Sequence, residues 1–235
     1  MNILVTGASR GIGKAIALGL KNSGNVFVTS RSENDLKSLG CAGYFVCDLA
    51  DEENLISLGN YIKENDIDVL VNNAGEYIYS KIEETDTERL NHIMAVNLKA
   101  PVYLSGCAIP NMKKKNFGRI INIGSISGVM GEAYASLYSA TKAGLVGFSK
   151  AAGLELAQNG ITVNTINPGW VDTELGRGSI DDGEFSEEEI LDIIPQRRFV
   201  APEEVAGLVK YLISDEAKGI TGQSVNLCAG MSVGI

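Results

Sequence analysis

The chain has 235 residues, of which 45% are hydrophobic and 21% are charged, and its formal net charge is −9. This length suits one α/β domain whose core is large enough to need no disulfide or metal, and the negative charge excludes the basic footprint of a nucleic-acid-binding protein. The four cysteines form no C-x-x-C pair and His92 is the only histidine, which excludes a zinc site of the usual spacing. We therefore expect no bound metal and no nucleic acid.

Membrane and export signals are also missing from the sequence. No stretch reaches the ~18 consecutive apolar residues of a membrane span, and a first strand that starts at Asn2 leaves no room for a signal peptide. We expect a cytoplasmic protein with reduced cysteines. His92 lies inside a helical pattern, where we expect a packing or surface role rather than catalysis.

Short apolar runs alternate with longer amphipathic stretches along the whole chain. This alternation is typical of strand–helix units on a parallel sheet. It predicts a Rossmann-type doubly wound α/β fold, a parallel sheet of about seven strands with helices on both faces, in a single domain over residues 1–235. In chain order the predicted elements are strand 3–5, helix 11–20, strand 26–28, helix 34–39, strand 44–46, helix 53–62, strand 69–71, helices 87–96 and 102–113, strand 120–123, helix 137–156, strand 163–166, helix 202–212 and strand 224–227.

One long stretch, 170–198, does not follow this pattern. It is rich in glycine and contains the acidic run Glu187-Glu188-Glu189. Long loops inside a domain are commonly functional, and we interpret this one as a lid with some helix, Ser186 capping the acidic turn. Trp170, the only tryptophan, forms either a wall of a substrate site or packing under the lid.

A glycine-rich turn, Thr6-Gly7-Ala8-Ser9-Arg10-Gly11-Ile12-Gly13, follows the first strand and opens a helix. Glycines let the backbone approach a pyrophosphate, and the helix N-terminus supplies N–H donors. The spacing G-x-x-x-G-x-G differs from the G-x-G-x-x-G fingerprint, but the strand–turn–helix context still predicts a dinucleotide. The predicted contacts are Gly7, Ser9, Arg10, Gly11, Ile12 and Gly13.

Residues at the end of the second strand indicate which dinucleotide binds. An acid here would hold the ribose 2′-hydroxyl of NAD, but the chain has Ser30 and Arg31. A guanidinium matches the oxygens of a 2′-phosphate, and Arg10 adds a second positive charge. This favours NADP(H), although Arg31 as a plain surface residue remains an alternative.

Tyr138 and Lys142 stand four residues apart, on one face of the predicted helix 137–156. A tyrosine has an ordinary pKa of ~10, and a nearby ammonium should lower it toward the range useful for proton transfer with a carbonyl or alcohol oxygen. Ser125 follows the fifth strand, where its hydroxyl can donate to a developing alkoxide. The pair alone also fits an ordinary structural helix.

The combination of motifs resembles the classical short-chain dehydrogenase/reductase family over essentially the whole chain. Their order and spacing fit, including the 13-residue step from Ser125 to Tyr138, which favours Ser125 over Ser127 as the family's serine. The matching pieces are the glycine-rich turn, Asn72-Asn73-Ala74-Gly75, Asn97, Ser125, Tyr138 with Lys142, and Asn167-Pro168-Gly169.

The resemblance implies four catalytic residues. Tyr138 is the general acid or base, Lys142 lowers its pKa and contacts the nicotinamide ribose, and Ser125 positions the substrate oxygen. Asn97 holds a water that links Lys142 to solvent. The resemblance also implies a homotetramer and a set of cofactor contacts, namely Ser30, Arg31, Asp48, Leu49, Asn73, Ala74, Gly75, Tyr138, Lys142, Pro168, Gly169, Val171 and Thr173.

Within this family, segments 112–125 and 142–150 are most similar to bacterial 3-oxoacyl-acyl-carrier-protein reductases, which implies an acyl-thioester substrate and an acidic carrier protein as a possible partner. Asn159 stands where these enzymes usually have a docking arginine, and Lys115 is left as the other basic contact. The acidic lid and the C-terminal Cys228-Ala229-Gly230 also depart from the pattern. A dehydrogenase or reductase of a small ketone, sugar or polyol remains an alternative, and a non-catalytic cofactor-binding regulator a lesser one.

Overall fold

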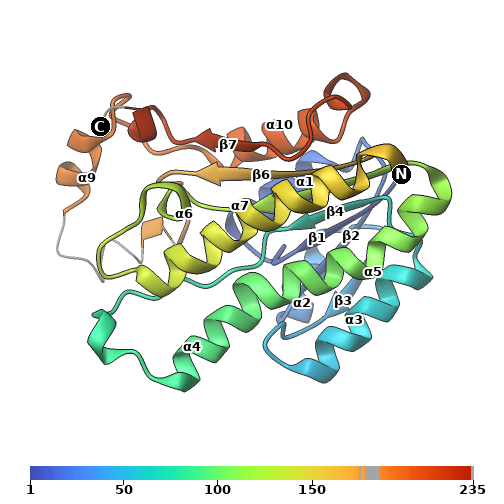
Figure 1. Ribbon diagram of the computed structural model, residues 1–235, viewed down its shortest axis with the longest axis horizontal. Helices are drawn as coiled ribbons and strands as arrows, with labels where there is room; N and C mark the ends of the chain where they lie inside the picture. Colours follow the sequence, from blue (N-terminus) through green and yellow to red (C-terminus); the bar gives the residue numbers. More distant parts are fainter. Residues whose placement is uncertain (175, 178–185, 234–235) are drawn as a thin grey trace.

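The computed structural model describes residues 1–174, 176–177 and 186–233. Seven strands form one sheet in the order β3-β2-β1-β4-β5-β6-β7, and every neighbouring pair is parallel (Figure 1). This confirms the predicted fold class and all seven predicted strands. The strands are β1 (Asn2–Thr6), β2 (Asn25–Ser30), β3 (Gly43–Val46), β4 (Val69–Asn72), β5 (Gly118–Ile123), β6 (Ile161–Pro168) and β7 (Ser224–Leu227).

Helices cover both faces of the sheet, because the central strands are apolar on both sides. All residues of β4, β5 and β6 are buried, as expected for a sheet packed between two helical layers. One layer holds α3, α5 and α7, and the other holds α1, α2 and α10. Their bounds are α1 (Gly11–Gly19), α2 (Glu33–Ser38), α3 (Glu52–Glu64), α5 (Ala100–Lys115), α7 (Ser136–Leu156) and α10 (Pro202–Leu212).

The strand order reverses beside β1. From β1 the chain first builds outward through β2 and β3, and then returns to place β4 on the other side of β1. At such a reversal the loops leaving the two strands diverge, and a crevice opens at the carboxyl ends of the strands. The glycine-rich turn follows β1 at this point.

Two helices predicted as separate are joined in the structure. α4 (Thr87–Met94) runs through a π-helical turn, η2 (Ala95–Lys99), directly into α5. The continuous segment Thr87–Lys115 is long and apolar enough to span a membrane by length and composition, but half of its most apolar window is buried inside the molecule. Packing of α5 on α3, β4 and β5 accounts for those apolar side chains.

The predicted lid is only partly described. α9 (Glu187–Ile193) begins with the predicted cap, in which Ser186 and Glu189 bind each other's backbone N–H groups. Residues 175 and 178–185 of the predicted lid lie outside the described residues.

A short helix that the sequence did not predict, α6 (Ser127–Met130), follows β5, and both α6 and α9 lie at the left of Figure 1.

Candidate active site

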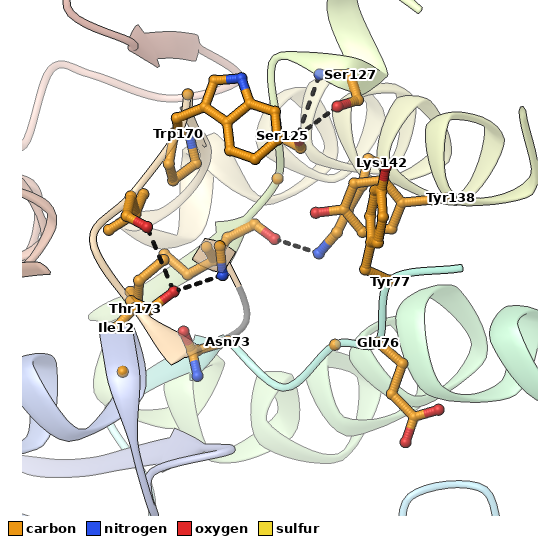
Figure 2. A pocket seen from close by; sticks show the side chains of 18 of the residues that line it. Ile12, Asn73, Glu76, Tyr77, Ser125, Ser127, Tyr138, Lys142, Trp170 and Thr173 are labelled. Carbon is orange, nitrogen blue, oxygen red and sulfur yellow. Dashed lines mark hydrogen bonds between the residues drawn. The ribbon is translucent and has the colours of Figure 1, made fainter. Parts of the chain in front are cut away.

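A cavity of about 1080 Å³ opens at the carboxyl ends of the strands. The turn after β1, the loops after β4, β5 and β6, and helices α6, α7 and α9 line it. In Figure 2, Ser125, Tyr138 and Lys142 lie toward one end with Trp170, and Ile12 and Asn73 lie toward the other. The cavity is therefore located where the sequence predicted a dinucleotide, and it is large enough for one with room beside it.

The glycine-rich turn is shaped by close backbone approaches. Gly7 has φ 65°, and a Cβ there would lie 2.7 Å from the Cα of Ala74. A Cβ on Gly13 would lie 2.2 Å from the carbonyl oxygen of Gly7 and 2.4 Å from Nδ2 of Asn73. Side chains at either position would push the turn away from β4, so the cavity floor exists only because both residues lack one.

Asn73 fixes this turn to the end of β4. Its Nδ2 donates to the carbonyl oxygens of Thr6 at 2.9 Å and of Gly7 at 3.1 Å. The Thr6 hydroxyl accepts the backbone N–H groups of Asn73 and Ala74, each at 3.0 Å. These bonds satisfy polar groups that a strand end would otherwise leave unpaired, and they hold two walls of the cavity in register.

The two arginines predicted to bind a 2′-phosphate both lie on the cavity wall, and both are in ion pairs. Arg31 contacts Glu76 at 3.2 Å and Arg10 contacts Glu174 at 2.8 Å. Each arginine side chain is 64% exposed, so these are weak surface pairs that a phosphate can displace. Glu76 also bonds His92 Nε2 at 2.6 Å, and His92 is not among the residues that line the cavity.

Tyr138, Lys142 and Ser125 come together at the other end of the cavity (Figure 2). Because Tyr138 and Lys142 are one turn apart on α7, the Lys142 ammonium lies 5.5 Å from the centre of the Tyr138 ring. The ammonium donates to the carbonyl oxygen of Ile123, at the end of β5, at 2.9 Å. Ser125 follows this strand, and its Oγ accepts from the backbone N–H of Ser127 at 3.1 Å.

Burial dominates the electrostatics of this pair. It raises the pKa of Tyr138 to about 12, an effect that a hydrogen bond with Ser125 opposes and the charge of Glu132 adds to. Burial also lowers the pKa of Lys142 to about 8. Burial therefore sets the pKa of Tyr138 in the chain by itself, and the lowering of that pKa by Lys142 stays a prediction.

Asn97 lies behind the catalytic groups, fully buried within the π-helical turn η2. Its Oδ1 accepts the backbone N–H of Glu76 at 2.9 Å, and its Nδ2 donates to the carbonyl oxygen of Glu76 at 2.8 Å and to Thr141 Oγ1 at 3.3 Å. It thus connects the loop after β4 to α7. π-Turns are concentrated at functional sites, but Asn97 is not part of the cavity wall.

A buried polar network anchors the helix that carries Tyr138 to the sheet. Asn72 Nδ2 donates to Asn122 Oδ1, and Asn122 Nδ2 donates to Ser149 Oγ, both at 2.8 Å. Thr165 Oγ1 donates to the same Ser149 oxygen at 2.7 Å. The network links β4, β5, β6 and α7, so it limits how far α7 can shift relative to the sheet.

Most of the predicted site residues line the cavity. The exceptions are Asn97 and Leu49. The Leu49 side chain is 8% exposed and packs in the hydrophobic core with Leu4 and Leu55. Those that line it are Gly7, Ser9, Arg10, Gly11, Ile12, Gly13, Ser30, Arg31, Asp48, Asn73, Ala74, Gly75, Ser125, Tyr138, Lys142, Pro168, Gly169, Val171 and Thr173.

Several polar residues of the cavity were not predicted, and three of them, Glu132, Ser127 and Tyr77, lie beside Tyr138. Glu132 accepts from the hydroxyls of Ser127 at 2.6 Å and Tyr77 at 2.7 Å, and all three line the cavity beside Tyr138. The only sequence signal for Glu132 is its place in the loop just before the Tyr138 helix, since polar loop residues at strand ends commonly bind ligands. Trp170 lines the cavity, and the centre of its ring system lies 6.4 Å from that of Phe199, so both of its predicted roles stay predictions.

Comparison with known proteins identifies the family. The family model described as enoyl-(acyl carrier protein) reductase matches residues 7–232, nearly the whole chain. The chain belongs to the short-chain dehydrogenase/reductase family. It is 40% identical to the 3-oxoacyl-[acyl-carrier-protein] reductase FabG of Salmonella typhimurium, over 97% of this chain and 96% of that protein.

Solved structures of short-chain dehydrogenases/reductases superpose on the chain throughout. A single-residue variant of the actinorhodin polyketide ketoreductase with NADPH is 36% identical, with a TM-score of 0.91 over 99% of this chain and 97% of that one. A putative gluconate 5-dehydrogenase of Beutenbergia cavernae with bound NADP is 32% identical, with a TM-score of 0.91 over 98% of this chain and 96% of that one. The protein is thus an oxidoreductase of this family.

Proposed function

We propose that the protein is an NADP(H)-dependent oxidoreductase that reduces a ketone to a secondary alcohol, or runs the reverse reaction. The observation that carries this proposal is the convergence of Tyr138, Lys142 and Ser125 at one end of a cavity whose other end is a glycine-lined turn. A proton donor and a hydrogen-bond donor to the reacting oxygen are thereby positioned beside a dinucleotide site.

The residues of the cavity fit NADP(H). The turn that Gly7 and Gly13 leave open suits a pyrophosphate at the N-terminus of α1, and Arg31 with Arg10 suits a 2′-phosphate. When bound, NADPH supplies the hydride, and NADP+ accepts one in the reverse direction. The polyketide ketoreductase and the putative gluconate 5-dehydrogenase structures contain NADPH and NADP, and the cofactor of this protein is NADP(H).

The chain's own groups handle the proton. The Ser125 hydroxyl, which donates to Ser127 Oγ at 3.0 Å in this structure, turns to donate a hydrogen bond to the substrate carbonyl oxygen. The Tyr138 hydroxyl delivers a proton to the same oxygen as the alcohol forms. Lys142 keeps its ammonium beside the tyrosine, where a positive charge stabilises the phenolate left behind. Asn97, behind Lys142, is proposed to hold the water through which the proton is replaced.

The first candidate substrate is a 3-oxoacyl thioester on an acyl carrier protein. The similarity to FabG supports it and would place the protein in fatty acid biosynthesis. Two basic contacts for an acidic carrier are weakened here, however. Asn159 is not basic, and the Lys115 ammonium is already held by Asp66 and Asp68, each at 2.6 Å.

The second candidate is a small polar ketone, sugar or polyol, and the chemistry of the cavity wall favours it. Glu132, Glu174, Glu189 and Asp192 all line the cavity. Glu174 and Asp192 are paired with Arg10 and Arg197, whereas Glu132 and Glu189 have no such ion pair among the described residues and repel an anionic substrate. The hydroxyls of Ser127 and Tyr77 add polar groups beside Tyr138. We infer that the physiological substrate is a small, polar, non-anionic ketone or the matching alcohol.

Three further proposals follow from family membership. The stretch 170–198 acts as a lid over the substrate, within a single domain over residues 1–235. The protein is a soluble, cytoplasmic homotetramer. The apolar side chains of Leu154 on α7, 82% exposed, and of Val102 on α5, 38% exposed, fit an interface that these two helices form with another copy.

The test is NADPH consumption with a panel that contains acetoacetyl-CoA, small hydroxyketones and, with NADP+, sugars and polyols. Turnover of small ketones or polyols without thioester reduction supports the second candidate, and rapid thioester reduction supports the first. The absence of turnover with every carbonyl and alcohol, while NADPH still binds, would contradict the enzyme proposal and favour a cofactor-binding regulator.

A further inference from the structure

Glu132 places a carboxylate inside the catalytic end of the cavity. It lies in the loop between α6 and α7, six residues before Tyr138. Oε2 accepts from the Ser127 hydroxyl at 2.6 Å and Oε1 accepts from the Tyr77 hydroxyl at 2.7 Å. Within the described part of the chain, no Lys, Arg or His forms an ion pair with it.

This carboxylate is directly connected to the reacting groups. Ser127, which donates to Glu132, accepts from Ser125 Oγ at 3.0 Å (Figure 2). The Tyr77 ring, whose hydroxyl also donates to Glu132, packs edge-on against the Tyr138 ring with centroids 5.1 Å apart. Glu132 is therefore two hydrogen bonds from the oxygen proposed to hold the substrate carbonyl, close enough to contact the atoms next to that carbonyl.

A carboxylate in this position discriminates between hydrogen-bond donors and acceptors. Its two oxygens have about four lone-pair sites, and two hydroxyls occupy only part of them. A substrate O–H or N–H that reaches it gains a charge-assisted hydrogen bond. A carbonyl or ether oxygen at the same place gains none and is repelled, because its lone pairs face a negative charge that is in no ion pair with a described residue.

We propose that Glu132 selects ketones with a hydrogen-bond donor, a hydroxyl or an ammonium, on the carbon next to the reacting carbonyl. This inference rests on the proposed ketone reduction and names the substrate class of the same site. A 3-oxoacyl thioester does not belong to this class, since a methylene group and then a second carbonyl follow its ketone. The rings of Tyr77, Tyr134 and Trp170 on the cavity wall suit either donor, by packing on C–H groups or by cation–π contact.

The experiment compares kcat/KM for hydroxyacetone, methoxyacetone and aminoacetone with NADPH. Hydroxyacetone and methoxyacetone differ in that the second has an acceptor but no donor. If the substrate donor forms a hydrogen bond to the charged Glu132 carboxylate, the wild-type kcat/KM for the better of the two donor ketones should exceed that for methoxyacetone by about 10-fold or more. A higher value for aminoacetone than for hydroxyacetone identifies an ammonium, and the opposite order identifies a hydroxyl.

The variant Glu132→Gln keeps the size of the side chain and removes its charge. The ratio of donor ketone to methoxyacetone should fall to within about 3-fold of unity, because the charge-assisted bond is lost. Asp192→Asn is the matched control, since Asp192 lines the same cavity on α9 but is paired with Arg197 at 3.1 Å. This variant should retain the wild-type ratio.

Two results would overturn the inference while leaving the proposed function intact. One is a wild type that reduces all three ketones with equal kcat/KM, a measurement that needs no variant. The other is a Glu132→Gln enzyme that slows on all three ketones equally and keeps the ratio, as a purely structural role for Glu132 would predict. If the wild type reduces no ketone at all with NADPH, the proposed function itself fails.

Discussion

Replacement of Arg31 by alanine tests which dinucleotide the cavity binds. A hydrogen bond between charged groups stabilises a complex by about 1.5–3 kcal/mol. Because the Arg31 side chain is 64% exposed, its bond to the 2′-phosphate should lie near the lower end of this range. NADPH must also displace the 3.2 Å contact of Arg31 with Glu76, which costs up to about 1 kcal/mol for an exposed pair. The net loss of about 0.5–2 kcal/mol should raise the Kd for NADPH about 2- to 30-fold.

Fluorescence titration or calorimetry of both reduced cofactors gives the answer. Arg31→Ala should leave the Kd for NADH unchanged, since NADH has no 2′-phosphate. Glu76→Gln, which frees Arg31, should tighten NADPH binding by up to about 5-fold. Equal weakening of NADH and NADPH by Arg31→Ala would refute the assignment, because Arg31 would then contact a part that the two cofactors share.

Three other substitutions test separate parts of the site. Ser125→Ala should lower kcat for ketone reduction about 10²–10³-fold with no change in NADPH affinity; a loss confined to NADPH binding would contradict the role of Ser125. Gly13→Ala should weaken NADPH binding and lower Tm, since its Cβ would lie 2.2 Å from a carbonyl oxygen. Gly19→Ala in the same helix, whose Cβ would lie 3.5 Å from its nearest neighbour, should do neither. Equal effects of the two substitutions would contradict the role of the glycine-rich turn in cofactor binding. Lys142→Met should stabilise the cofactor-free protein below pH 8, because burial lowers the Lys142 pKa to about 8 and the folded state then holds an unfavourable charge. The unfolded state keeps its proton up to pH ~10.5, so wild-type stability should rise relative to Lys142→Met by on the order of 1.4 kcal/mol per pH unit above pH 8. A difference between the two urea-unfolding free energies that does not vary with pH would refute this.

The strands and most helices could be predicted because their signals are local. Each central strand is a short apolar run buried on both faces, and Pro202 begins α10 as a proline at a first helical turn does. The break predicted between residues 96 and 102 is wrong. Pro101 there lies in the first turn of α5, and the π-turn η2 carries the helix through without a gap, which depends on packing that a local pattern does not contain.

The candidate site also has a part that local sequence signals predict and a part that they do not. The glycine-rich turn, Ser125, Tyr138 and Lys142 have fixed spacings along the chain, and the structure brings them to one cavity. Contacts between distant residues have no such spacing. The pair of Arg31 with Glu76 joins the loops after β2 and β4, and the bond of Tyr77 with Glu132 joins the loop after β4 to the loop before α7. These contacts follow only from the folded sheet.

The pKa of Tyr138 is a further property that spacing alone does not determine. The four-residue separation predicts attraction between Tyr138 and Lys142, and this does place the ammonium 5.5 Å from the ring. The sequence does not reveal how far folding removes the two groups from solvent. Burial raises the pKa of Tyr138 to about 12 and lowers that of Lys142 to about 8, so in the chain by itself Tyr138 is neutral near pH 7, whereas Lys142 keeps its charge below about pH 8.

The central claim is that Tyr138 delivers the proton in a ketone reduction, and Tyr138→Phe tests it most directly. The variant removes one hydroxyl and keeps the ring that packs against Tyr77. We predict that it binds NADPH with wild-type affinity and loses about 10²–10⁴-fold in kcat for the best ketone of the panel. A Tyr138→Phe enzyme that keeps wild-type turnover would contradict the account, because the proton would then come from another group.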